Sequence, residues 1–77
     1  MKNKQYTSDF EQIYKIGTDL LVNERFEDDE GFYKNHYQWA TQNTDNSVTI
    51  HKQVPDTSSY TSWSEAIEAF KTFLKKT

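Results

Sequence analysis

The feature that most constrains the fold is the spacing of apolar residues in the C-terminal stretch 62–76. They recur at intervals of three and four, the stripe of an amphipathic helix: Trp63, Ala66, Ile67, Phe70, Phe73 and Leu74. Ser62 and Glu65 have the spacing of a capping box at the helix start, and Lys75 and Lys76 suit its negative end. A helix this short is marginal alone in water, so we expect its two Phe and one Trp to be buried against the rest of the chain.

The core that this helix joins must be small and rich in aromatic residues. The chain has 77 residues, which predicts a single domain over 1–77. It has no cysteine, so neither disulfides nor thiolate metal sites can stabilise it. Five Phe, five Tyr and two Trp are the large side chains available for burial. Residues 1–7 are polar, and we expect them to be disordered.

The middle of the chain is typical of antiparallel strands. Residues 18–26 predict a strand, and the acidic stretch that follows predicts a hairpin loop with Gly31 at a positive φ. Residues 32–42 are rich in aromatic residues, which suits a half-buried strand. A turn at 43–46 then leads to an alternating strand over 47–54.

The hydrophobic pattern also predicts how these strands pair. Joining the first two strands through the acidic loop sets Glu24 opposite Lys34. Pairing the second strand with the third sets Trp39 opposite Ile50, which gives both strands one shared apolar side.

Residues before the first strand predict a short helix over 9–16. Ser8 and Glu11 have capping-box spacing, and Phe10, Ile13 and Tyr14 form a helical face that ends near Gly17. The predicted fold is therefore α+β with the order αβββα: a three-stranded antiparallel meander with the C-terminal helix, and the short N-terminal helix, packed on one side. The alternative is αββα, in which one long helix continues through the glycine to about residue 25.

The sequence has none of the motifs that would indicate catalysis. There is no H-E-x-x-H, no glycine-rich phosphate loop and no G-x-S-x-G. The predicted register sets His51 opposite Gln38 and diagonally next to His36, so the two histidines could share a metal or a proton. Two solvent-facing strand residues are the simpler interpretation. We therefore expect no catalytic residues, no metal site and no cofactor, and a protein that is not an enzyme.

The strongest functional signal is a cluster of acidic residues in a chain of net charge −3. Of twelve acidic residues, six lie between Asp19 and Glu30. Five of these six, together with neighbouring aromatic residues, form the predicted partner-binding site: Glu24, Glu27, Asp28, Asp29, Glu30, Phe26, Phe32 and Tyr33. Spaced carboxylates can occupy a basic groove in place of nucleic-acid phosphates, whereas the simpler interpretation is a solubilising hairpin tip.

In small size, acidic balance, lack of cysteine and aromatic richness, the chain is similar to phage-encoded or mobile-element proteins that inhibit host enzymes, including anti-CRISPR proteins. The similarity is one of composition and carries over no residue. It implies a non-catalytic inhibitor or adaptor whose partner is a bacterial nucleic-acid-handling enzyme. We expect a cytoplasmic monomer or weak homodimer that binds neither nucleic acid nor membrane directly, since no basic stripe and no long apolar run is present.

Two other functions fit the sequence. One is a single-stranded nucleic-acid binder that stacks bases on Tyr33, Tyr37 and Trp39. The other is an accessory domain that associates with itself through an exposed strand edge.

Overall fold

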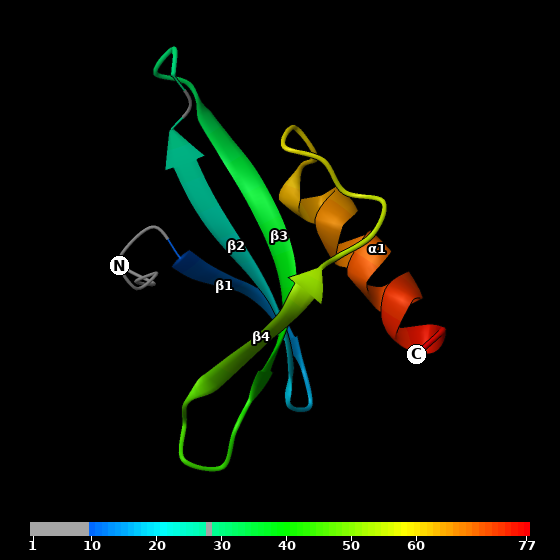
Figure 1. Cartoon of the computed structure of the whole chain (residues 1–77). Helices are drawn as coiled ribbons and strands as arrows, with labels where there is room; N and C mark the ends of the chain where they lie inside the picture. Colours follow the sequence, from blue (N-terminus) through cyan, green and yellow to red (C-terminus); the bar gives the residue numbers. More distant parts are fainter. Residues whose placement is uncertain (1–9, 28) are drawn as a thin grey trace.

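A computed structural model describes residues 10–27 and 29–77. Four antiparallel strands form one sheet in the order β1-β2-β3-β4, and a helix lies on one side of it (Figure 1). The element bounds are β1 Phe10–Ile16, β2 Asp19–Glu27, β3 Tyr33–Gln42, β4 Val48–Gln53 and α1 Trp63–Lys75. The predicted α+β class and C-terminal helix are confirmed. The residues expected to be disordered, 1–7, lie outside the described residues.

Helix α1 begins at the predicted capping box. The backbone N–H of Glu65 donates to Ser62 Oγ at 3.2 Å, and the N–H of Ser62 donates to Glu65 Oε1 at 3.1 Å. Ala66 and Phe70 of the apolar stripe are fully buried. Trp63 is 44% exposed, however, so the expectation that this residue is buried is wrong.

The first element is a strand, and the predicted N-terminal helix is wrong in both its short and its long form. Ile16 pairs with Asp19, so Gly17 and Thr18 form a two-residue hairpin loop with Gly17 at φ 61°. A bulge between Gln12 and Tyr14 interrupts the strand's alternation, and both Ile13 and Tyr14 pack against the core under α1. Because of this bulge, the apolar spacing of β1 resembles that of a helix.

The hairpin of β2 and β3 was predicted correctly as a strand, an acidic loop and a strand. Gly31 has φ 89°, as its place in the loop predicted. The register differs from the prediction by two residues: Glu24 lies opposite His36, and Phe26 lies opposite Lys34. A shift of two keeps every side chain on its predicted side of the sheet.

The register of β3 and β4 differs from the prediction by one residue over 40–42 and by two residues at Trp39 and Gln38. A difference of one changes the side on which residues of β4 lie. Ala40 pairs with Ile50, whereas Trp39 pairs with Lys52, and a bulge at His51 separates the two pairs. Ile50 and Trp39 therefore do not share one apolar side as predicted. The bulge instead turns the His51 ring toward Trp39, with 4.1 Å between ring centroids.

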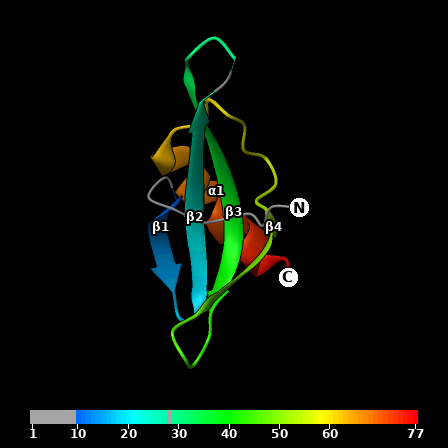
Figure 2. The same cartoon turned by 60° about the vertical axis from the view of Figure 1, so that its left-hand side comes forward.

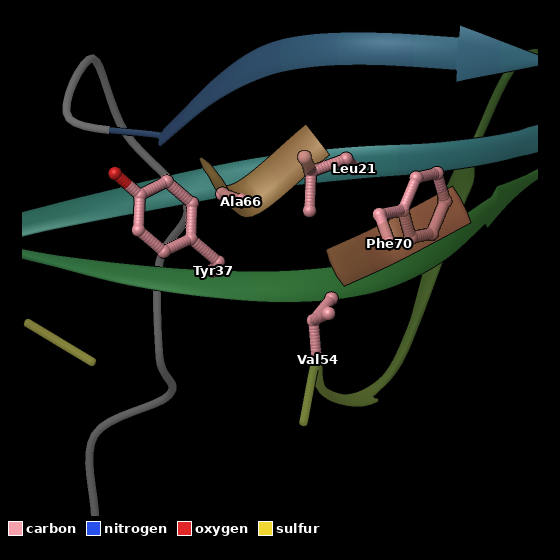
Figure 3. Packing of buried hydrophobic residues seen from close by; sticks show 5 residues of the cluster. All are labelled: Leu21, Tyr37, Val54, Ala66 and Phe70. Carbon is pink, nitrogen blue, oxygen red and sulfur yellow. The ribbon is translucent and has the colours of Figure 1, made fainter. Parts of the chain in front are cut away.

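Buried residues occupy both sides of the sheet. On the side toward α1, which we call the helix side, the core consists of five residues (Figure 3): Leu21, Tyr37, Val54, Ala66 and Phe70. Leu20, Val22 and Ala40 form a second buried cluster, with Ile50 packed against it. Since side chains alternate along a strand, this second cluster lies on the opposite side.

Candidate functional site

The β2–β3 hairpin projects past both neighbouring strands. Among the described residues, β2 and β3 stay paired as far as Glu27 and Tyr33, whereas β1 pairs with β2 only to Glu24 and β4 pairs with β3 only to Gln38. Both views show the hairpin loop at one end of the molecule, beyond the rest of the sheet (Figures 1 and 2). The predicted site is therefore carried on a strand pair that presents it away from the core.

The alternation of the strands divides the predicted site between two sides of the hairpin. Leu21 lies on the helix side, so alternation places Arg25 and Glu27 there as well, and Tyr33 pairs with Glu27. Glu24 and Phe26 lie on the opposite side. The structure therefore does not bring Phe26 and Tyr33 into one surface, although both belong to the predicted site.

Glu24 is a carboxylate of the strand and not of the tip. Its Oε1 lies 3.7 Å from His36 Nδ1, and Gln38 Nε2 donates to the same oxygen at 3.4 Å. The ring of Phe26 meets His36 edge-on, with 6.4 Å between ring centroids. These contacts make Glu24 part of the hairpin's stem.

The other predicted residues lie at the tip. Glu27, Asp29 and Glu30 are exposed, and the side chains of Phe32 and Tyr33 are 66% and 67% exposed. Asp28 lies outside the described residues. Carboxylates in solvent interact weakly one at a time, but several on one tip raise the local negative potential. Exposed aromatic rings beside them are typical of the residues that dominate binding energy at protein interfaces.

Sequence reasoning missed two aromatic residues at this end of the molecule. Tyr60 is 79% exposed, and Trp63 at the start of α1 is 44% exposed. The backbone N–H of Asn35 donates to the Ser59 carbonyl at 3.3 Å, which fixes the segment before the helix beside β3. The sequence did contain a signal that Tyr60 is exposed, because this residue is the only aromatic one in a polar stretch without apolar periodicity.

Buried polar side chains join the two strands of the hairpin stem and connect the stem to the segment before α1. Asn23, only 1% exposed, donates through Nδ2 to Asn35 Oδ1 at 3.0 Å and accepts the backbone N–H of His36 at 3.1 Å. The hydroxyl of buried Tyr37 donates to the Thr61 carbonyl at 2.6 Å. Burial raises the pKa of Tyr37; the hydrogen bond from Asn35 opposes this shift, and the charge of Glu65 adds to it.

The two histidines do not form a shared site. His36 lies beside Glu24 on the side away from α1, whereas His51 stacks on Trp39 and lies 2.6 Å from Thr41 through Nε2 and Oγ1. The predicted diagonal contact between His36 and His51 is wrong, because His51 lies in the bulge of β4 and stacks on Trp39. Residues 10–27 and 29–77 contain neither a detectable pocket nor a group of three His, Asp or Glu that could hold a metal ion.

The aromatic residues of β3 do not lie on one exposed platform. Tyr37 is completely buried. The ring of His51 stacks on Trp39. The ring of Phe73 contacts Trp39 edge-on, with 5.3 Å between these two ring centroids. Of the three rings considered for base stacking, Tyr33 is the one that is exposed.

Comparison of the chain with family models, with curated proteins and with solved structures finds no match in any of the three. In the described part of the chain, no helix combines the length and the apolar character needed to cross a membrane.

Proposed function

We propose that the protein is a non-catalytic binding protein whose β2–β3 hairpin docks on a basic, nucleic-acid-binding surface of a bacterial protein. It would act there as an inhibitor or adaptor that competes with nucleic acid. The observation that carries the proposal is the projecting hairpin, which presents Glu27, Asp29 and Glu30 together with the exposed rings of Phe32 and Tyr33. Carboxylates attract a basic surface over a distance, and the rings supply apolar area whose burial against the partner is favourable.

The projecting geometry also supports the proposal. A strand pair is ordered before it meets its partner, so little conformational entropy is lost on binding compared with a disordered acidic tail. Because the tip extends past β1 and β4, it can enter a concave surface that the rest of the sheet could not approach.

The test is capture of partners from a nuclease-treated bacterial lysate at low and at high salt. The tip variant replaces three described carboxylates by their amides: Glu27→Gln, Asp29→Asn and Glu30→Gln. We expect the wild type to retain a nucleic-acid-binding protein at low salt, and the tip variant to lose it. Purified partner should then bind nucleic acid or the hairpin, but not both at once.

A control variant matches the change in charge at distant sites. It carries Glu11→Gln, Asp56→Asn and Glu68→Gln, and these three residues are exposed and lie outside the hairpin. Each variant removes three negative charges from a chain of net charge −3. If both variants lose the partner equally, net charge and not the hairpin governs binding. If the tip variant keeps the partner, the proposed surface is wrong.

A further inference from the structure

The ring of Tyr33 already contacts a guanidinium group within the chain. The Cζ atom of Arg25 lies over this ring, 5.8 Å from its centroid. The electron-rich face of an aromatic ring attracts a cation, and a planar guanidinium can also stack on it. Tyr33 nevertheless remains 67% exposed, so much of its surface is open to a further group.

Tyr60 lies on the same side and at the same end of the molecule. It belongs to a turn in which the backbone N–H of Thr61 donates to the Ser58 carbonyl at 3.2 Å. The bond from Asn35 to Ser59 holds this turn against β3. The residue after Tyr60 is contacted from the helix side of β3, because the hydroxyl of Tyr37, a helix-side core residue, donates to the Thr61 carbonyl at 2.6 Å. Figure 2 shows the segment before α1 beside the upper part of the hairpin.

A carboxylate accompanies these rings. Glu27 lies directly opposite Tyr33 in the β2–β3 ladder, so both side chains lie on the helix side of the hairpin. A guanidinium can donate two parallel hydrogen bonds to a carboxylate while its plane lies against a ring. The ammonium group of lysine is a strongly hydrated point charge and gains less from the same surroundings.

We propose that the helix side of the hairpin, with Tyr33, Tyr60 and Glu27, binds arginine side chains in a basic segment of the partner protein. The inference rests on the proposed function, because it assigns the partner that the acidic hairpin meets. It adds that the contact selects arginine over lysine, and that the two tyrosine rings provide this selection.

Two peptides of equal charge, hexa-arginine and hexa-lysine, serve as probes in calorimetric titrations of the full chain at low salt. We expect hexa-arginine to bind about threefold to tenfold more tightly, because a guanidinium stacks on the rings and is more weakly hydrated than an ammonium group. In the double variant Tyr33→Leu and Tyr60→Leu, which keeps apolar bulk but lacks the rings, this ratio should fall toward one.

The matched control is the double variant Tyr33→Phe and Tyr60→Phe, which keeps both rings and should keep the ratio. The tip variant described above should weaken the binding of both peptides. It should change the ratio of their affinities less than the leucine variant does, because it removes charges and keeps both rings. An equal affinity for the two peptides, no binding of either, or an unchanged ratio in the leucine variant would each overturn the inference.

The experiment separates this inference from the proposed function. If the tip variant loses the captured partner but the peptides show no selection by the rings, the proposed function stands and the arginine assignment fails. If selection is observed but the tip variant keeps the partner, the proposed function fails while the surface still binds arginine. If oligothymidylate binds tightly and this binding is lost in the leucine variant, the surface binds single-stranded nucleic acid and not a basic peptide.

Discussion

At the scale of single residues, the side chain of Asn23 joins the two strands of the hairpin stem. It is buried, and both its amide nitrogen and its oxygen have partners on β3, the Asn35 side chain and the His36 N–H. The substitution Asn23→Ala leaves both partners without their hydrogen bonds inside the fold. We expect the free energy of unfolding to fall by about 1–3 kcal/mol, as measured by urea denaturation.

Gln12→Ala is the control for this prediction, because Gln12 is an exposed amide on β1. It should change the free energy of unfolding by less than about 0.5 kcal/mol. Equal effects of the two substitutions would mean that the polar contacts of Asn23 contribute nothing specific to stability.

Tyr37 predicts how stability depends on pH. Burial raises the pKa of its hydroxyl above the ordinary value of 10.0 in the folded state, whereas the unfolded chain ionises near that value. Above pH 10 the unfolded state therefore binds fewer protons than the folded state, and stability falls as pH rises. Denaturation curves across this range should show a smaller loss in Tyr37→Phe than in the wild type.

The phenylalanine variant also loses the hydrogen bond from the hydroxyl to the Thr61 carbonyl. Below pH 9 we therefore expect it to be less stable than the wild type by about 1 kcal/mol. If the alkaline loss of stability is the same in both proteins, the hydroxyl of Tyr37 does not titrate in the way its burial requires.

At the scale of elements, Gly17 distinguishes the observed hairpin from the predicted helix. Its φ of 61° is unfavourable for a residue with a Cβ, although no atom lies within 4 Å of the position a Cβ would take. We expect Gly17→Ala to lower the free energy of unfolding by about 1–2 kcal/mol. In a continuous helix the same change would be stabilising by up to about 1 kcal/mol. The sign of the change in unfolding free energy, measured by urea denaturation, distinguishes the hairpin from the continuous helix.

Gly17→Asn is a second variant at this position. Asparagine adopts a positive φ more readily than alanine, so it should be the less destabilising of the two. Alanine more stable than both glycine and asparagine would contradict the two-residue turn.

The projecting part of the hairpin should open more easily than its base. Residues 25–27 of β2 lie beyond the end of β1, whereas residues 20–22 are paired on both sides. Elements with few buried contacts open locally at low free energy. Native-state hydrogen exchange should therefore give lower protection for amides of 25–27 than for amides of 20–22. Equal protection would mean that the hairpin opens only when the whole sheet does.

The sequence predicted elements best where one local pattern agreed with the tertiary contacts. The capping box of Ser62 and Glu65 and the acidic loop before Gly31 are local signals, and both are confirmed. Two of the errors, the helix in place of β1 and the register of β4, each coincide with a bulge. A bulge adds one residue to a strand, so a pattern read with a strict period of two fails there.

Prediction of the candidate site was limited for a different reason. The sequence identified the run of carboxylates, but which of them share a side depends on the pairing of β2 with β3. The position of Tyr60 beside the hairpin depends on the contact of Ser59 with Asn35, two residues far apart in the chain. No local pattern encodes such a contact.

At the scale of the whole molecule, both edge strands of the described sheet are irregular. β1 has its bulge near Ile13, and β4 has its bulge at His51. Bulged edges offer a poor template for another strand, because the ladder of hydrogen bonds is interrupted. We therefore expect the protein to remain monomeric as its concentration rises, as measured by sedimentation equilibrium. A mass that increases with concentration would favour self-association through an edge instead.

The projection of the hairpin past β1 and β4 separates the residues of the proposed binding surface from those that hold the fold together. Residues 29–32 are exposed and follow the last paired position of β2, so their sequence can be replaced without altering the buried clusters. One scaffold could in this way display different loops, and the specificity of the protein could diverge among descendants while the sheet and helix stay the same.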